Sequence, residues 1–210
     1  MNLDWLQEKC RVFLSDMAPA DAAHDINHIN RVVKNVTYLT DIEKCNSLIT
    51  LPSAWLHDCI AVAKDSPLRA QGSKLAAGAA TKFLAANAYP KKLLPEVFHA
   101  IEAHSYTADI PTRTLEAAVV QDADRLDSLG AIGIARCLLV GGRLNRPLCD
   151  NEDPFCDERD PDDGQFTIDH FYAKLFKLPA TMKTDAGRKE AQRRADLMQR
   201  YLDDLRKEIM

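Results

Sequence analysis

The sequence predicts an all-α fold. Apolar residues recur every three or four positions along most of the chain, which is the spacing of one face of a helix. No segment shows the alternation of apolar and polar residues that marks a half-buried strand. The 210 residues, 46% of them hydrophobic, are enough for one domain with a full core. We therefore expect a single helical domain over residues 1–210.

The first half of the chain divides into five predicted helices. The spacing of Leu3 and Leu6 begins the first, and Asp25 can cap the second. Pro52 is expected in the first turn of the third helix, where its missing N–H costs little. A Tyr-Pro pair separates the fourth helix from the fifth. These helices cover about residues 3–16, 25–40, 47–62, 70–88 and 92–104.

Four more helices are predicted in the second half, at about residues 114–127, 131–140, 166–178 and 185–208. In the last helix, apolar residues from Ala191 to Ile209 alternate at three- and four-residue spacing. Because this pattern is too short for several heptads, we interpret it as a helix that closes the core rather than a coiled coil.

Residues 141–165 form the only long irregular stretch of the sequence. They contain two cysteines and an acidic run from Glu152 to Asp163. A loop of this length is usually a lid, a binding loop or a disordered segment. We expect a lid or rim whose carboxylates face solvent, with Arg143 or Arg146 turned toward a ligand. A disordered loop without a role is the alternative. The domain thus has a core at about 20–140, this loop, and C-terminal helices at 166–210.

Composition narrows the class of protein. The net charge of −4 offers no broad basic surface for nucleic acid. No apolar run approaches the ~18 residues that would span a membrane. The six cysteines contain no C-x-x-C pair, so we expect free thiols in a reducing compartment. The first residues lack the pattern of a signal peptide. These features predict a cytoplasmic protein.

Three clusters combine imidazole or carboxylate groups with apolar helical runs. The first is H-D-I-N-H-I-N-R-V at residues 24–32, where His24, His28 and Arg31 lie on the flank of the apolar stripe. The second is the pair His57-Asp58, and the third is Q-D-A-D-R-L-D at residues 121–127. A set of N and O donors without thiolate suits a catalytic divalent metal that keeps positions open for water.

Each cluster also has a purely structural interpretation. The first can be a solvated helix edge, and the buried carboxylate of Asp58 can be neutralised by an arginine instead of a metal. The third can consist of local ion pairs that contribute little. Within it, the apolar periodicity favours Asp122 over Asp124 as the buried acid.

The order H…HD…D on successive helices resembles the HD-domain superfamily of metal-dependent phosphohydrolases. The segments HDINHINRV, LHD, IEAHSY, QDADRLDSLGAIGIAR and DHFYAKLFKLP…TDAGRKEAQRR resemble its YpgQ/YedJ-type branch, from about residue 20 to the end. The resemblance implies an HD-type helical bundle in which the metal ligands are His28, His57, Asp58 and Asp124. It thus selects Asp124 as the ligand, although the apolar periodicity favours Asp122 as the buried acid. It also makes His57 and Asp58 the catalytic pair.

One divalent ion per chain is then expected, preferably Mn²⁺ or Mg²⁺, with Fe²⁺, Ni²⁺ and Co²⁺ as further options. Substrate phosphates need cations or imidazoles to neutralise them. The candidates are His24, Arg31, Lys74, His104 and Arg125. His104 can equally be a core residue bonded to a backbone carbonyl.

The resemblance implies hydrolysis of nucleotide phosphate or pyrophosphate bonds, as in a (deoxy)nucleoside triphosphate pyrophosphohydrolase. The expected partner is a small nucleotide, bound by a monomer or homodimer. Two alternatives remain: a non-catalytic nucleotide sensor, and another metal enzyme on the same scaffold such as a di-metal oxygenase. The latter needs extra ligands, for which His24 and His104 are available.

Overall fold

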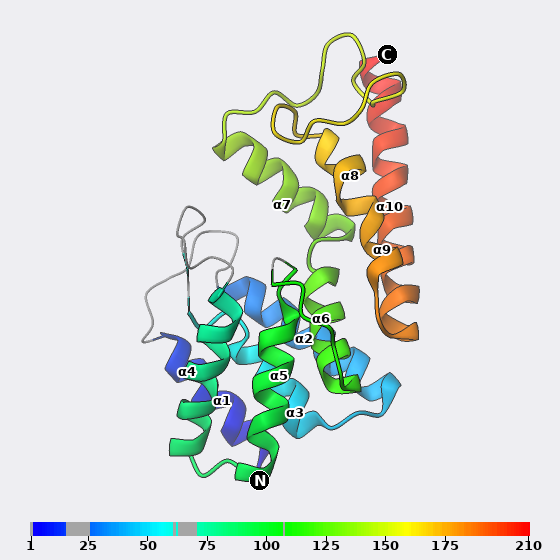
Figure 1. Cartoon of the computed structure of the whole chain (residues 1–210). Helices are drawn as coiled ribbons and strands as arrows, with labels where there is room; N and C mark the ends of the chain where they lie inside the picture. Colours follow the sequence, from blue (N-terminus) through cyan, green and yellow to red (C-terminus); the bar gives the residue numbers. More distant parts are fainter. Residues whose placement is uncertain (1, 16–25, 61, 63–70, 107) are drawn as a thin grey trace. The chain divides into compact units, whose positions relative to one another are not determined.

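The prediction of an all-α fold is confirmed. A computed structural model describes residues 2–15, 26–60, 62, 71–106 and 108–210, and these contain helices and no strand (Figure 1). The chain forms two compact units, residues 1–124 and 125–210. The division falls within the last turn of one helix, Leu115–Leu126 (α6). The expectation of a single domain over residues 1–210 stays a prediction.

The first unit is built around a short, very apolar helix. It contains α1 (Leu3–Ser15), α2 (Ile26–Glu43), α3 (Ser47–Leu56), α4 (Gly72–Ala86), a 3₁₀ turn (Lys91–Leu93) and α5 (Leu94–His104). Every residue of α3 from Ile49 to Leu56 is buried, as expected for a helix that is covered on all sides. α1, α2 and α5 all pack against α3, and α4 and α5 lie side by side. The segment that follows α3 therefore starts inside the core.

Pro52 was predicted to lie in the first turn of its helix. It lies instead in the interior of α3. A proline there has no N–H to give to the carbonyl four residues earlier, which belongs to Leu48. The structure supplies another donor, because the hydroxyl of Tyr89 donates to that carbonyl over 2.5 Å. A side chain from the turn before α5 thus replaces the missing hydrogen bond within α3.

Two of the predicted helices need correction, one in where it ends and one in whether it is continuous. The third helix was expected to reach residue 62, but α3 ends at Leu56 and the chain turns through residues 57–60. The continuous helix expected at about 166–178 is instead three short pieces: α8 (Asp169–Ala173), a 3₁₀ turn (Leu175–Lys177) and α9 (Leu178–Thr181). Pro179 occupies the first turn of α9, a place that a proline tolerates at the start of a helix and not in its interior.

The second unit rests on two longer helices. α7 (Gly130–Arg143) packs against α10 (Asp185–Ile209), and α9 also packs against α10. Thr184 caps α10 by accepting a hydrogen bond from the N–H of Gly187. Because α7 runs to Arg143, the long connection begins three residues later than predicted. A side chain at Gly141 would overlap that of Thr167, so glycine permits the end of this connection to pack on α7.

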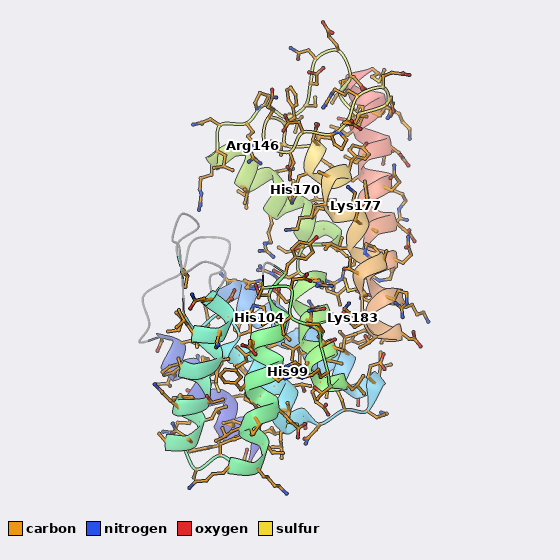
Figure 2. The ribbon with its side chains drawn as sticks, in the orientation of Figure 1. His99, His104, Arg146, His170, Lys177 and Lys183 are labelled. Carbon is orange, nitrogen blue, oxygen red and sulfur yellow. The ribbon has the colours of Figure 1, made fainter. Side chains whose placement is uncertain are left out.

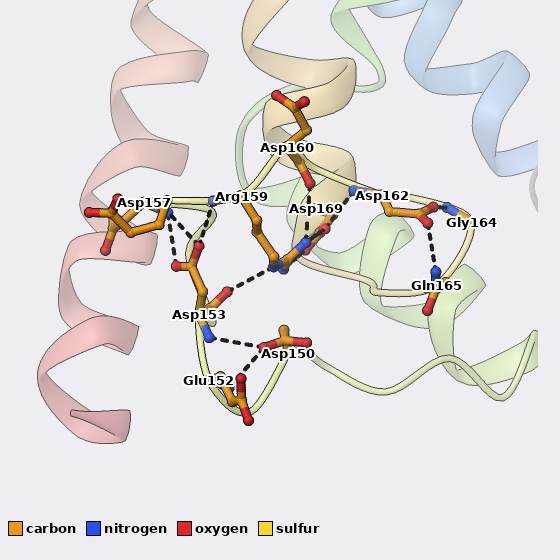
Figure 3. Close-up of polar contacts among 11 residues, drawn as sticks. Asp150, Glu152, Asp153, Asp157, Arg159, Asp160, Asp162, Gly164, Gln165 and Asp169 are labelled. Carbon is orange, nitrogen blue, oxygen red and sulfur yellow. Dashed lines mark hydrogen bonds and ion pairs between the residues drawn. The ribbon is translucent and has the colours of Figure 1, made fainter.

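This connection is folded by its own acidic residues (Figure 3). We call residues 150–169 the acidic loop. Asp153 accepts hydrogen bonds from the N–H groups of Asp157, Glu158 and Arg159, at 2.8–3.0 Å. The guanidinium of Arg159 pairs with both carboxylate oxygens of the fully buried Asp169, at 2.5 and 2.9 Å. Several of these carboxylates are exposed, as expected, but they also act as acceptors that hold the loop together. Closure of the loop over a ligand stays a prediction.

All six cysteines are free thiols, and burial raises the pKa of Cys10 and Cys59 to about 12. Cys10 and Cys59 are therefore packing residues rather than reactive thiols. In the described part of the chain, no helix is long and apolar enough to cross a membrane.

Candidate metal centre

Two histidines stand at the carboxyl ends of two helices and are held in the same way. His57 directly follows α3 and has its Nδ1 2.8 Å from the carbonyl oxygen of Ala54. His104 is the last residue of α5 (Figure 2) and has its Nδ1 2.6 Å from the carbonyl oxygen of Ile101. A carbonyl only accepts, so Nδ1 carries the hydrogen in each ring. The Nε2 atom of each ring is consequently the one that faces the other site residues.

Four of the predicted residues come together at this point. We call His28, His57, Asp58 and Asp124 the metal cluster. The Nε2 atoms of His28 and His57 are 3.3 Å apart, and the Oδ1 of Asp124 lies 3.4 Å from the former and 3.9 Å from the latter. The Oδ2 of Asp58 lies 3.6 Å from Nε2 of His57 and 4.0 Å from Nε2 of His28. The imidazoles are buried, whereas the two carboxylates are 27–28% exposed. The cluster is thus open to solvent on its carboxylate side.

These spacings fit a divalent ion. Donor atoms that share one ion at about 2.0–2.2 Å stand roughly 3–4 Å from one another. Two imidazole nitrogens and two carboxylate oxygens form a donor set typical of a catalytic ion with open positions. The group whose donor atoms all lie within 4.8 Å of one another consists of His28, His57 and Asp58, and Asp124 adds an oxygen beside the two imidazoles. The donor chemistry and the spacing therefore agree.

Asp58 also contacts a fifth residue. Its second oxygen, Oδ1, lies 3.4 Å from the Nε2 of His104, whose ring packs edge-on against that of His57 with the centroids 4.9 Å apart. His104 was interpreted either as a group of the site or as a core residue bonded to a backbone carbonyl. The structure shows features of both, because Nδ1 lies beside a backbone carbonyl and Nε2 contacts the carboxylate of Asp58.

The pKa values of His57 and His104 move in opposite directions. Burial is the largest influence on His57 and lowers its pKa, although the charge of Asp58 opposes this. Burial also acts to lower the pKa of His104, but the hydrogen bond and charge of Asp58, together with the charge of Asp124, raise that pKa to about 9. At neutral pH His57 is therefore neutral with a lone pair on Nε2, the form that binds metals. His104 is an imidazolium that donates to Asp58.

Asp122 and Asp124 occupy different environments on α6. Asp122 is fully buried, as the apolar periodicity predicted. The carboxylate that faces His28, however, belongs to Asp124, as the family resemblance implied. The apolar periodicity identifies the most buried acid, which is Asp122. The acid that faces the histidines at the solvent-accessible side of the cluster is the less buried Asp124.

The remaining candidates are spread over several elements. Arg31 is half-buried in α2, and Lys74 is exposed in the first turn of α4. Arg125, the first residue of the second unit, donates to the carbonyl of Thr181 at 2.9 Å. His24, and the capping role expected of Asp25, lie outside the described residues.

Two buried amides beside the site were not anticipated. Asn35 lies on the buried face of α2, two turns after His28, and Gln121 lies on α6, one turn before Asp124. An asparagine within an otherwise apolar helical stripe is the signal that could have identified the first.

Comparisons with known proteins identify the family of the chain. A family model described as the HD domain matches residues 25–129. The chain is 30% identical over 200 residues to the uncharacterized protein YpgQ of Bacillus subtilis (strain 168). This alignment covers 93% of the chain and 89% of YpgQ. The crystal structure of B. subtilis YpgQ in complex with ADP has a TM-score of 0.74 at 29% identity, over 97% of each chain. An HD-superfamily hydrolase from Bacillus thuringiensis has a TM-score of 0.77 at 31% identity, over 99% of this chain and 98% of its own.

Proposed function

Because the chain belongs to the HD-domain family, we propose that it hydrolyses phosphate or pyrophosphate bonds of nucleotides with the help of one divalent ion. The likeness to HD-superfamily hydrolases supports a hydrolase. The observation that carries the metal dependence is the meeting of two imidazole nitrogens and two carboxylate oxygens at the metal cluster. His28, His57, Asp58 and Asp124 would hold the ion, with Mn²⁺ or Mg²⁺ preferred.

The tautomers and protonation states of two histidines suit these roles. The hydrogen bond to Ala54 fixes the tautomer of His57, and burial keeps its Nε2 unprotonated. When bound, a divalent ion supplies positive charge for a phosphoryl oxygen and acidifies nearby water. His104 holds a proton on Nε2 next to Oδ1 of Asp58. This pair is suited to accept or return a proton during hydrolysis.

The nucleotide substrate is supported by one comparison and by the candidate cations. The structure of B. subtilis YpgQ was determined in complex with ADP, and the chain is similar to that protein along almost its whole length. Arg31, Lys74 and Arg125 are proposed to neutralise phosphate oxygens, with His24 and His104 as imidazole partners. Within this class we favour a (deoxy)nucleoside triphosphate as substrate and release of pyrophosphate.

A product assay tests the proposal directly. The purified protein is stripped of metal, supplied with Mn²⁺ or Mg²⁺, and given a panel of ribo- and deoxyribonucleoside mono-, di- and triphosphates. Separate detection of pyrophosphate and orthophosphate identifies the bond that is cleaved. We expect metal-dependent pyrophosphate release that disappears in Asp58→Asn. Orthophosphate as the product would correct the bond that is cleaved, and binding of nucleotide without any product would instead favour a sensor.

A further inference from the structure

A buried asparagine connects two of the helices that carry the metal cluster. The Nδ2 of Asn35 on α2 donates to the carbonyl oxygen of Ala123 on α6 at 3.0 Å, and Asn35 is only 8% exposed. α2 also carries His28, and Ala123 directly precedes Asp124. The bond therefore fixes the backbone next to Asp124 relative to the helix of His28.

A buried glutamine makes the corresponding connection between α6 and α5. The Nε2 of Gln121 donates to the carbonyl oxygen of Ala103 on α5 at 2.7 Å, and Gln121 is 3% exposed. Ala103 directly precedes His104, the residue that contacts Asp58. Ala103 lies in the last turn of α5, where backbone carbonyls receive no donor from a following turn of the same helix, and the side chain of Gln121 supplies one.

The glutamine is not optimal for stability. Among the described residues, the Oε1 of Gln121 is a buried acceptor with no hydrogen-bond partner. Such an atom loses its hydration on folding and gains nothing in return. An apolar side chain of the same length would avoid this loss, so the fold alone does not explain an amide here. Its use lies in what the Nε2 bond holds in place.

The two amides share one arrangement. Each donates, from a buried position, to the carbonyl that immediately precedes a residue of the site, and each bond joins α6 to a neighbouring helix. Resting on the proposed metal function, we propose that Asn35 and Gln121 are positioning residues. They hold α6 between α2 and α5, so that Asp124 keeps the spacing from His28 that a divalent ion requires and His104 stays beside the carboxylate of Asp58.

Binding of Mn²⁺ to the metal-free protein tests this inference without use of activity. The dissociation constant is measured from the electron paramagnetic resonance signal of free Mn²⁺ for wild type, Asn35→Leu and Gln121→Met. Loss of a partner that orients metal ligands typically weakens binding ~10–100-fold, and we expect a weakening of this size in both variants. The melting temperature of metal-free Gln121→Met is expected to stay close to that of wild type, since the unpaired oxygen leaves together with the Ala103 bond.

Thr40→Val serves as the matched control. The hydroxyls of Thr40 and Thr50 form a buried hydrogen bond of 2.9 Å between α2 and α3, away from the carbonyls beside the site residues. This variant should melt at a lower temperature but bind Mn²⁺ as wild type does. Should Asn35→Leu not fold, Asn35→Ser removes the same amide donor, leaves a smaller polar side chain, and is titrated in its place.

The outcomes separate the inference from the function on which it rests. Wild-type Mn²⁺ affinity in both amide variants, or an equal loss of affinity in Thr40→Val, overturns the positioning role while the metal centre stands. A wild-type protein whose Mn²⁺ binding is absent, or is unaffected by Asp124→Asn, overturns the proposed metal centre itself.

Discussion

The metal cluster and the acidic loop are both rich in aspartate, yet their carboxylates face different partners. In the acidic loop, Asp169 is paired with a guanidinium and Asp153 with three backbone N–H groups. In the metal cluster, Asp58 and Asp124 face the imidazoles of His28 and His57. A carboxylate held by arginine and backbone is already neutralised and serves structure. A carboxylate that faces imidazole nitrogens at a solvent opening offers oxygen atoms that a metal ion can bind.

The largest expected effect comes from removing a charge of the metal cluster. Asp124→Asn should abolish metal binding and metal-dependent activity, a loss greater than the ~100-fold that a displaced partner of a ligand causes. Asp122→Asn should weaken both only ~10–100-fold, because Asp122 is buried beside the site and Asp124 faces His28. Calorimetric Mn²⁺ titration measures the difference. A more severe defect in Asp122→Asn contradicts the assignment.

The acidic loop should respond in stability rather than in metal binding. Arg159→Met leaves the buried Asp169 without its guanidinium and is expected to lower the free energy of unfolding by about 3–5 kcal/mol. Urea denaturation measures this loss, and Mn²⁺ affinity should not change. Arg206→Met is the control, because Arg206 and Asp157 form an exposed pair whose removal should have little effect. Similar destabilisation in both variants would show that burial of Asp169 is not the cause.

Metal removal should affect only one of the two regions. Mn²⁺ at 100 times its dissociation constant is expected to stabilise the folded protein by about 2.7 kcal/mol, and chelation should reverse this. Thermal melts with Mn²⁺ and with EDTA measure the increment. It should persist in Arg159→Met and vanish in Asp124→Asn. An increment that survives in Asp124→Asn would place the ion elsewhere.

Moderate acid should distinguish the regions with a smaller effect. Burial lowers the pKa of His57 below its usual value, so its neutral form contributes stability that is present above pH ~6.5 and is lost as the pH falls below that. Backbone N–H groups lower the pKa of Asp153, whose contribution is present above its ordinary pKa of ~3.9 and is lost only in stronger acid. Mn²⁺ affinity should therefore fall once the pH drops through the lowered pKa of His57, whereas the amides of residues 157–159 should keep their protection from hydrogen exchange at pH ~5. Loss of that protection at pH 5 would show that the loop depends on other groups.

Alkaline conditions should act on His104 in the metal-free protein. Asp58 holds the pKa of His104 at about 9, above the unfolded value of ~6.5. Its contribution to stability is therefore complete below pH ~6.5 and is lost as the pH rises through about 9. Melting temperatures of metal-free wild type should fall over this interval more than those of His104→Gln. Parallel curves for the two proteins would contradict a charged His104.

The helices were largely predictable because their residues alternate between core and surface at a constant period. The exceptions have local physical causes. Pro52 was placed at a helix start because a proline lacks a donor, and the sequence does not reveal that Tyr89 replaces it. The third helix was extended to residue 62 because its apolar pattern continues, whereas the chain leaves the helix after Leu56.

In the site, too, the residues that belong to a local sequence pattern could be predicted, whereas those defined by tertiary contacts could not. The dipeptide His57-Asp58 could be recognised in the sequence, and the resemblance to HD domains selected Asp124 over Asp122. Periodicity favoured Asp122 because it reports burial, and Asp122 is indeed fully buried. Asn35 and Gln121 were missed because their partners are backbone carbonyls, which every residue has, and only the packing of α2, α5 and α6 decides which carbonyl each amide meets.

The hydroxyl of Tyr89 has a consequence for how the protein acquires its structure during synthesis. α3 lacks one of its own hydrogen bonds at Pro52 and receives the substitute from a residue 41 positions after Leu48. When α3 leaves the ribosome, the tyrosine has not yet emerged, so the first turns of this helix stay incomplete. The segment that precedes His57-Asp58 therefore gains its final backbone only after the chain has grown through α4. Tyr89→Phe should slow this step, which refolding kinetics followed by tryptophan fluorescence can detect in a Trp5→Phe background that keeps Trp55 as the reporter.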